Sequence, residues 1–233
     1  MRLRLSVLCL LAAFSPGLSI AQTPPPAAVD ALVPSIAPAP LVLPEQTPPV
    51  QQVQTPSPVQ PAAPAEVRTT LVPSPGDPTG VEDVVLPGKP AAIATGISNW
   101  EQAFDNLKTA FVKIEEELKR AGIAPTGKPL TVFVHTDDQG FRYEAMIPVA
   151  SIPEGKTELT PEIKFGKTPE GKAFRFVHKD AYEEIDGTYE TITAYLDAKD
   201  IVARDAFIEE YVSEMKDATD PDLEVNIYVQ PKE

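Results

Sequence analysis

Apolar residues recur at helical spacing in the stretch that follows Ser98. Five of them lie three or four residues apart: Phe104, Leu107, Phe111, Ile114 and Leu118. This spacing is typical of a helix with one buried face. The order Ser-Asn-Trp-Glu at residues 98–101 resembles a capping box, and Gly122 suits the left-handed residue after a helix. The pattern predicts a helix over residues 99–121.

Short apolar runs on both sides of this helix have the composition of strands. One precedes the helix at residues 90–96, and two follow it at residues 130–135 and 141–149. The last two are separated by a polar segment that ends in Gly140, which is typical of a turn. The unit is therefore strand, helix, strand, strand.

The same order of elements recurs about 80 residues later. Its members are strands at residues 173–178, 207–213 and 223–229, with a helix at residues 182–198 after the first. The final strands of the two units also share Glu, Ile and Val at matching positions. We interpret this as a duplication. It predicts an α+β domain in which two strand-helix-strand-strand repeats pack with pseudo-twofold symmetry and leave a groove between them.

The N-terminal third has a different composition. Arg2 and Arg4 precede an apolar run, and small residues stand just before the expected cleavage site, which follows Ala21. This is the layout of a cleaved signal peptide. Of the 27 prolines, 18 lie between Gln22 and Pro90, so no periodic apolar face is available there. We expect a signal peptide at 1–21, a disordered proline-rich linker at 22–80 and a folded domain at 81–233. This organisation predicts export to the bacterial periplasm, with no membrane span left after cleavage.

Charge and cysteine content exclude several classes of function. The net charge of −14 repels phosphates, which argues against a nucleic-acid partner. Cys9, the single cysteine, lies inside the predicted signal peptide, so disulfides, thiolate metal sites and a cysteine nucleophile are not expected in the domain. His135 with Asp137 and Asp138 has the composition of a turn rather than of a metal site. We therefore expect no metal and no cofactor.

The second half of the chain resembles the GyrI-like (gyrase-inhibitor-like) family, the effector-binding domain attached to AraC-type and MerR-type regulators. The similarity rests on the segment Val-His-Lys-Asp-Ala-Tyr-Glu at residues 177–183 and on four later features: Tyr189, Leu196, Glu-Glu-Tyr at 209–211, and Ile-Tyr-Val at 227–229. Two features depart from the family. Asp180 stands where glycine is usual, and a signal peptide and proline-rich segment stand in place of a helix-turn-helix.

This resemblance implies a small-molecule partner. Members of the family bind amphipathic, often cationic compounds in the groove between the repeats, and a glutamate in a Glu-x-Tyr pattern receives the positive charge. Carried over to this sequence, that glutamate is Glu209, followed by Tyr211. Strand alternation places both on one face and Glu210 on the other.

Aromatic residues complete the predicted ligand site. Trp100 and Tyr182 stand near the beginnings of the two helices, Phe133 belongs to the equivalent strand of the first repeat, and Tyr143 follows on the next strand. Their flat rings suit a hydrophobic cation. Tyr189 lies on the apolar stripe of the second helix, where a core role is favoured. The alternative for Glu209 is an ordinary solvated glutamate.

Three functions remain open at this point. The first is an exported receptor that captures amphipathic or cationic aromatic molecules with a central carboxylate. The second, implied by the same resemblance, is hydrolysis of strained alkylating cyclopropane compounds, with Glu209 as the catalytic base. The third is a tethered envelope protein whose proline-rich segment carries the interaction.

Overall fold

The computed structural model describes residues 68–73 and 80–232. These contain nine strands, two α-helices and one short 3-10 helix: β1 (Glu82–Pro87), β2 (Pro90–Ser98), α1 (Ala103–Arg120), β3 (Leu130–Asp137), β4 (Gly140–Pro148), β5 (Glu158–Thr160), β6 (Ile163–Lys167), β7 (Glu170–Lys179), η1 (Tyr182–Glu184), α2 (Ile185–Ala198), β8 (Ala203–Tyr211) and β9 (Glu224–Pro231). The architecture is mixed α and β, as predicted.

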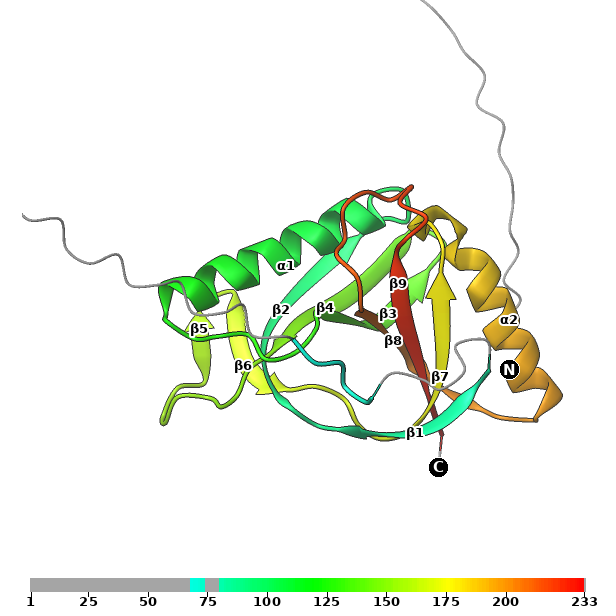
Figure 1. Ribbon diagram of the computed structural model, residues 1–233, viewed down its shortest axis with the longest axis horizontal. Coiled ribbons are helices and arrows are strands. Elements are labelled where there is room, and N and C mark those ends of the chain that lie inside the picture. Colours follow the sequence, from blue (N-terminus) through cyan, green and yellow to red (C-terminus); the bar gives the residue numbers. More distant parts are fainter. Residues whose placement is uncertain (1–67, 74–79, 233) are drawn as a thin grey trace, which may run out of the picture. The chain divides into compact units, whose positions relative to one another are not determined.

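All nine strands form one antiparallel sheet in the order β1-β7-β9-β8-β3-β4-β2-β6-β5. The two predicted units occupy it as β7-β9-β8 and β3-β4-β2, so that the second strand of each unit lies at the centre. Helix α1 packs along β2 and β4, and α2 packs along β7 (Figure 1). The strand order is compatible with a duplication, and the pseudo-twofold axis itself stays a prediction.

Helix α1 forms where the apolar period predicted it, but it begins later. All five residues of its stripe are buried. Ser98 ends β2, and its hydroxyl donates to the carbonyl of Asn99 at 2.8 Å instead of capping the helix. The Asn99 side chain accepts the N–H of Gln102 at 2.9 Å, and the helix starts at Ala103. The capping-box prediction was therefore wrong about the first turn.

Three strands had no counterpart in the sequence prediction. β1 pairs with β7 at one edge of the sheet, and the β5–β6 hairpin lies at the other edge, where β6 pairs with β2. Their sequences are short and mix charged residues with apolar ones, so the periodicity was weak. The six predicted strands are all present, with ends shifted by a few residues.

The two faces of the sheet carry separate hydrophobic clusters. The larger one lies on the face covered by the helices, here called the helix face, and includes the buried stripe of α1. The smaller one lies on the opposite face and contains ten buried residues: Leu71, Val72, Leu86, Ala91, Leu130, Val132, Met146, Ala173, Ile208 and Tyr228. No helix covers this second cluster in the described part of the chain.

Residues 68–73, here called the strap, supply two members of that second cluster. Leu71 and Val72 are 5% and 8% exposed, and Thr69 forms an isolated parallel bridge with Gly127. The sequence predicted a disordered linker over residues 22–80, whereas residues 68–73 pack on the sheet, because two adjacent apolar residues suffice to bury this segment without any longer period. The rest of the predicted linker up to residue 67, and the predicted signal peptide, lie outside the described residues. Among those described, no helix is long and apolar enough to cross a membrane.

Candidate functional site

Strand β8 places two neighbouring glutamates on opposite faces of the sheet. Glu209 points to the helix face and is 1% exposed, while Glu210 points to the opposite face and is fully buried. Tyr211 shares the helix face with Glu209, as alternation predicted. The interpretation of Glu209 as a solvated glutamate is therefore wrong.

Three tyrosine hydroxyls donate hydrogen bonds to the Glu209 carboxylate. Tyr189 donates to Oε1 at 2.7 Å, and Tyr211 donates to Oε2 at 2.7 Å. Tyr182 donates to Oε2 at the longer distance of 3.3 Å. These tyrosines come from α2, β8 and η1, so three elements meet at one carboxylate.

The electrostatics of this cluster follow from its burial. Desolvation raises the pKa of Glu209, and the three hydroxyl donors oppose that rise because they stabilise the charged form. Burial and the neighbouring carboxylate also raise the pKa of each of the three tyrosines well above the ordinary value. The tyrosines therefore remain protonated and act as donors. Among the described residues, no basic side chain forms an ion pair with Glu209.

The strand beside β8 lines the same site from the other unit. Thr131 of β3 stands directly opposite Glu209, and Phe133 stands opposite Phe207. Thr131 is fully buried, and its hydroxyl has no hydrogen-bond partner in the described part of the chain. One unit thus contributes a carboxylate, and the other contributes an uncharged hydroxyl at the matching place.

A row of aromatic rings continues from Phe133 to the end of the sheet. Phe141 lies 5.0 Å from Phe133, 5.8 Å from Tyr143 and 4.9 Å from Trp100 between ring centroids. Trp100 is half exposed and donates from Nε1 to the carbonyl of Asp137 at 2.9 Å. Tyr143 lies over Gly96, where a Cβ would come within 2.3 Å of its ring, so only glycine leaves room for it.

The structure brings together some of the predicted ligand residues and not others. Tyr182 and Tyr211 contact Glu209 directly. Phe133 follows Thr131, the residue opposite Glu209, as the next residue of β3 on the same face. Trp100 and Tyr143 belong to the aromatic row and make no hydrogen bond to the carboxylate among the described contacts.

Tyr189 was missed as a site residue. Its ring lies on the stripe of α2 and packs on Phe207 with centroids 5.5 Å apart, so the core interpretation describes the ring. Its hydroxyl, however, makes one of the two shortest bonds to Glu209. Periodicity reports the face of a residue and not where its polar tip ends, which is why the sequence could not separate these roles.

His178 fixes the turn from which Tyr182 projects. It is buried at the end of β7, with Nε2 3.0 Å from the carbonyl of Ala181 and Nδ1 2.8 Å from the hydroxyl of Thr188. Asp180, which replaces the glycine usual in the family, accepts the N–H of Ala181 at 2.8 Å. The substitution therefore supports the turn through a side-chain bond.

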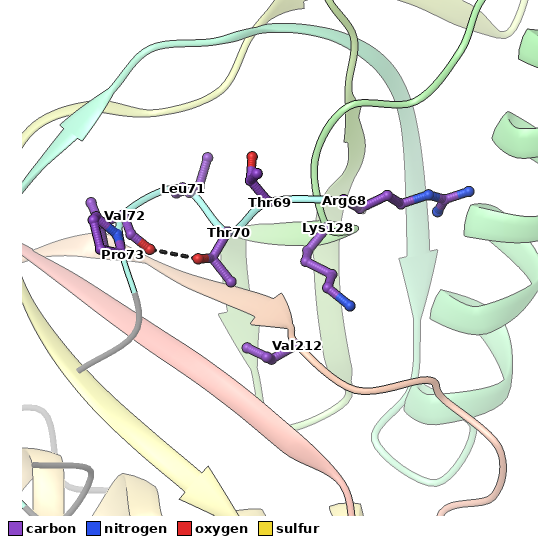
Figure 2. A pocket seen from close by; sticks show the side chains of 8 residues that line it. All are labelled: Arg68, Thr69, Thr70, Leu71, Val72, Pro73, Lys128 and Val212. Atoms are coloured by element: carbon purple, nitrogen blue, oxygen red, sulfur yellow. Dashed lines mark hydrogen bonds between the residues drawn. The ribbon is translucent and has the colours of Figure 1, made fainter. Parts of the chain in front are cut away.

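The carboxylate site is closed by its own side chains. Two pockets among the described residues, of about 430 and 300 Å³, lie elsewhere, one beside the strap and one beside β1 and β7. Figure 2 shows the first, which is lined by the strap together with Lys128 and Val212. No group of three or more metal-binding side chains occurs among residues 68–73 and 80–232.

Two solved structures of EcmrR share the fold of this domain. The C-terminal domain of EcmrR matches with a TM-score of 0.55 and 13% identity, over 66% of this chain and 97% of that domain. EcmrR in complex with DNA matches with a TM-score of 0.55 and 14% identity, over 66% of this chain and 57% of the EcmrR chain. SAV2435 bound to tetraphenylphosphonium gives a lower TM-score of 0.46 with 14% identity, over 66% of this chain and 94% of the SAV2435 chain.

Sequence comparisons agree on the family. No curated protein matches the chain. The family model of the GyrI-like small molecule binding domain matches residues 81–232, which include the buried glutamate, its three tyrosines and the whole sheet. The chain therefore belongs to the family of GyrI-like small molecule binding domains.

Proposed function

We propose that the domain is a receptor for amphipathic cations, in which Glu209 is the charge partner. The observation that carries this proposal is that Glu209 is buried and accepts bonds from three hydroxyls, while no basic side chain in the described part of the chain pairs with it. A buried carboxylate without a counter-ion is costly. A ligand cation would remove that cost, which gives the site a built-in preference for positive charge.

Aromatic rings around the carboxylate suit the same ligand. Tyr182 packs on Phe104, and Tyr211 meets Phe111 edge-on at 5.3 Å. Ring faces attract cations by about 0.5–2 kcal/mol each. Because the site is closed, a ligand has to displace a hydroxyl before it reaches Glu209. Tyr182 is the weakest of the three donors by distance and is only partly buried, so we expect it to move first.

The test uses tetraphenylphosphonium as an aromatic cation without hydrogen-bond donors, and triphenylphosphine oxide as an uncharged aryl compound. We expect Glu209→Gln to lower the affinity for the cation about 5- to 150-fold, equivalent to ~1–3 kcal/mol. Affinity for the uncharged compound should change much less. Isothermal titration calorimetry measures both.

The matched control is Glu190→Gln, an exposed glutamate beside Tyr189 on α2. It removes the same charge from the surface and should leave both affinities unchanged. Equal losses in the two variants would mean that the net charge of the protein attracts the ligand, and the site assignment would then be abandoned.

A second candidate function is hydrolysis of strained alkylating cyclopropane compounds. The observation that favours it is the raised pKa of Glu209 in an enclosed site, since a general base works best with a pKa near the operating pH. Glu209 would accept a proton from water while the water oxygen bonds to a ring carbon. The C–C bond of the cyclopropane breaks, its electron pair passes to the group conjugated with the ring, and the proton is then returned there. Loss of turnover in Glu209→Gln with binding of the compound retained would establish this activity, and no turnover by the wild type would exclude it.

We further propose that the domain acts outside the cytoplasm, on the basis of the Arg-rich start, the apolar run and the small residues before position 22. N-terminal sequencing of the protein from a periplasmic fraction should begin at Gln22. A start at Met1 would contradict export. We also propose that the two units arose by internal duplication. The recurring order of elements supports this, as does the strand order, in which β7-β9-β8 of one unit mirrors β3-β4-β2 of the other.

A further inference from the structure

The strap is anchored to the loop that leads into β3. The N–H of Thr69 donates to the carbonyl of Thr126 at 3.1 Å, and the N–H of Lys128 donates to the carbonyl of Thr69 at 3.0 Å. Lys89 donates from Nζ to the carbonyl of Thr70 at 2.9 Å. Figure 2 shows the strap with Lys128 beside it. These bonds hold the main chain of the two successive strap residues Thr69 and Thr70.

The strap is also bound by two buried charged side chains. Glu210 accepts the N–H of Leu71 through Oε1 at 2.5 Å, while its Oε2 accepts from Asn226 and Tyr228. Arg175, which is 3% exposed, donates to the carbonyl of Pro73. Without the strap, both Glu210 and Arg175 would lose a buried partner. Such groups are rarely left unpaired, so these contacts form a built recognition site for the strap.

Glu210, which holds the strap, is the direct neighbour of Glu209, the proposed charge partner. One peptide unit separates a carboxylate bound to three tyrosines on the helix face from a carboxylate bound to the strap on the opposite face. Across β3, Thr131 faces Glu209 and Leu130 faces Glu210. The two strands that form the floor of the ligand site therefore also hold the strap.

From this arrangement we propose that ligand binding at Glu209 and docking of the strap oppose each other through β8. A cation that enters between Glu209 and the tyrosine hydroxyls pushes β8 away from the helices and toward the strap. Because Glu210 on the same strand accepts the N–H of Leu71 at 2.5 Å, such a shift acts directly on a bond that holds the strap. The strap, residues 68–73, then loosens from the sheet. This inference takes its ligand from the proposed function.

The direct test is amide hydrogen exchange at Leu71, followed by NMR in the full mature chain with tetraphenylphosphonium as the probe. We expect saturating probe to speed exchange at Leu71 by about tenfold or more. The N–H of Phe165, bonded to the carbonyl of Thr157 in the β5–β6 region, is the control and should not change. Unchanged or slower exchange at Leu71 with the probe bound would overturn the proposal.

Thermodynamic linkage gives a reciprocal test. If the probe loosens the strap, a weakened strap must raise the affinity for the probe by a matching factor. Leu71→Ala, which lies on the opposite face from the ligand site, should raise the affinity about 3- to 10-fold. Val202→Ala, at a residue 64% exposed, is the matched control and should have no effect. Equal affinities of wild type and Leu71→Ala, within twofold, would contradict the coupling.

Failure of the proposed function is distinguishable from failure of the coupling. If calorimetry detects no binding of the probe, the receptor function fails with this ligand class, and the coupling is judged on Glu209→Gln alone. That variant removes the charge on one face of β8, and exchange at Leu71 on the other face should change at least threefold while Phe165 stays unchanged. Identical exchange at Leu71 in wild type and variant would overturn the coupling.

Discussion

Leu71→Ala should destabilise the domain less than an equally buried leucine of the same cluster. Leu71 and Leu130 are 5% and 0% exposed and both belong to the cluster on the face opposite the helices. Leu130 lies in a central strand that cannot detach, so Leu130→Ala should cost about 2–5 kcal/mol. Leu71 lies in a six-residue strap that can leave the sheet. The cost of Leu71→Ala is therefore limited to the free energy with which the strap docks.

That docking free energy can be worked out from the contacts. Burial of Leu71 and Val72 contributes about 1.5–3 kcal/mol each. The hydrogen bonds to the strap from Glu210, Arg175, Lys89 and the loop at 126–128 contribute about 0.5–1.5 kcal/mol each. Ordering six residues costs about 1–2 kcal/mol per residue. These opposing terms nearly cancel, so docking contributes no more than a few kcal/mol.

Urea unfolding of three proteins measures this limit. Leu71→Ala should lose about 1–3 kcal/mol, and a chain that starts at Gly80 should lose the same amount, because both remove the docked strap. For a chain of this size the loss lowers the thermal midpoint by about 2–4 °C per kcal/mol. An unchanged midpoint in the shortened chain would show that the strap does not dock. A Leu71→Ala cost above that of the shortened chain would refute the idea that docking sets the limit.

The buried carboxylate makes two further predictions about stability. Because the folded-state pKa of Glu209 is raised, the contribution of Glu209 to stability is full below the ordinary pKa and is lost as pH rises through the raised pKa. Glu209→Gln should therefore unfold at a higher urea concentration than wild type near pH ~8, and this gain should vanish near pH ~4. A gain in stability that persists in acid would contradict the pKa argument. Tyr189→Phe should destabilise the domain near pH ~8 by about 1–3 kcal/mol. Tyr182→Phe should destabilise it less, because the Tyr189 hydroxyl lies 2.7 Å and the Tyr182 hydroxyl 3.3 Å from the carboxylate. Equal losses of stability that survive in the Glu209→Gln background would mean that packing of the rings, and not the hydrogen bonds, stabilises the domain.

Periodicity predicted the elements that bury one continuous face. The α1 stripe from Phe104 to Leu118 is strictly spaced, so the helix was found, and alternation in β8 placed Glu209 and Glu210 on opposite faces as observed. The start of α1 was mispredicted because the Ser98 hydroxyl donates to the carbonyl of Asn99 and accepts from the side-chain amide of Asn106. A local motif does not reveal these two bonds. Short edge strands such as β1 give too few residues for a period.

The candidate site was predicted in part for the same physical reason. Glu209 and Tyr211 lie two residues apart in one strand, so their shared face follows from local geometry. The bond from Tyr189 joins residues 20 positions apart, and the strap joins Leu71 to a residue 139 positions away. Such contacts depend on how helices and loops pack, and one sequence contains no pattern that encodes them.

The adjacent glutamates also affect how the chain can misfold. If β8 slipped by one residue so that Glu209 took the place of Glu210, Glu210 would move to the helix face at the place of Tyr211, so each face would still receive a carboxylate. The glutamates therefore do not discriminate against the slipped pairing. The neighbouring residues disfavour the slipped pairing. The slip would move Tyr211 out of its packing against Phe111 and would place the larger ring of Phe207 where Ile208 packs. Correct pairing of the central strands thus depends on the shapes of two apolar side chains beside the charges.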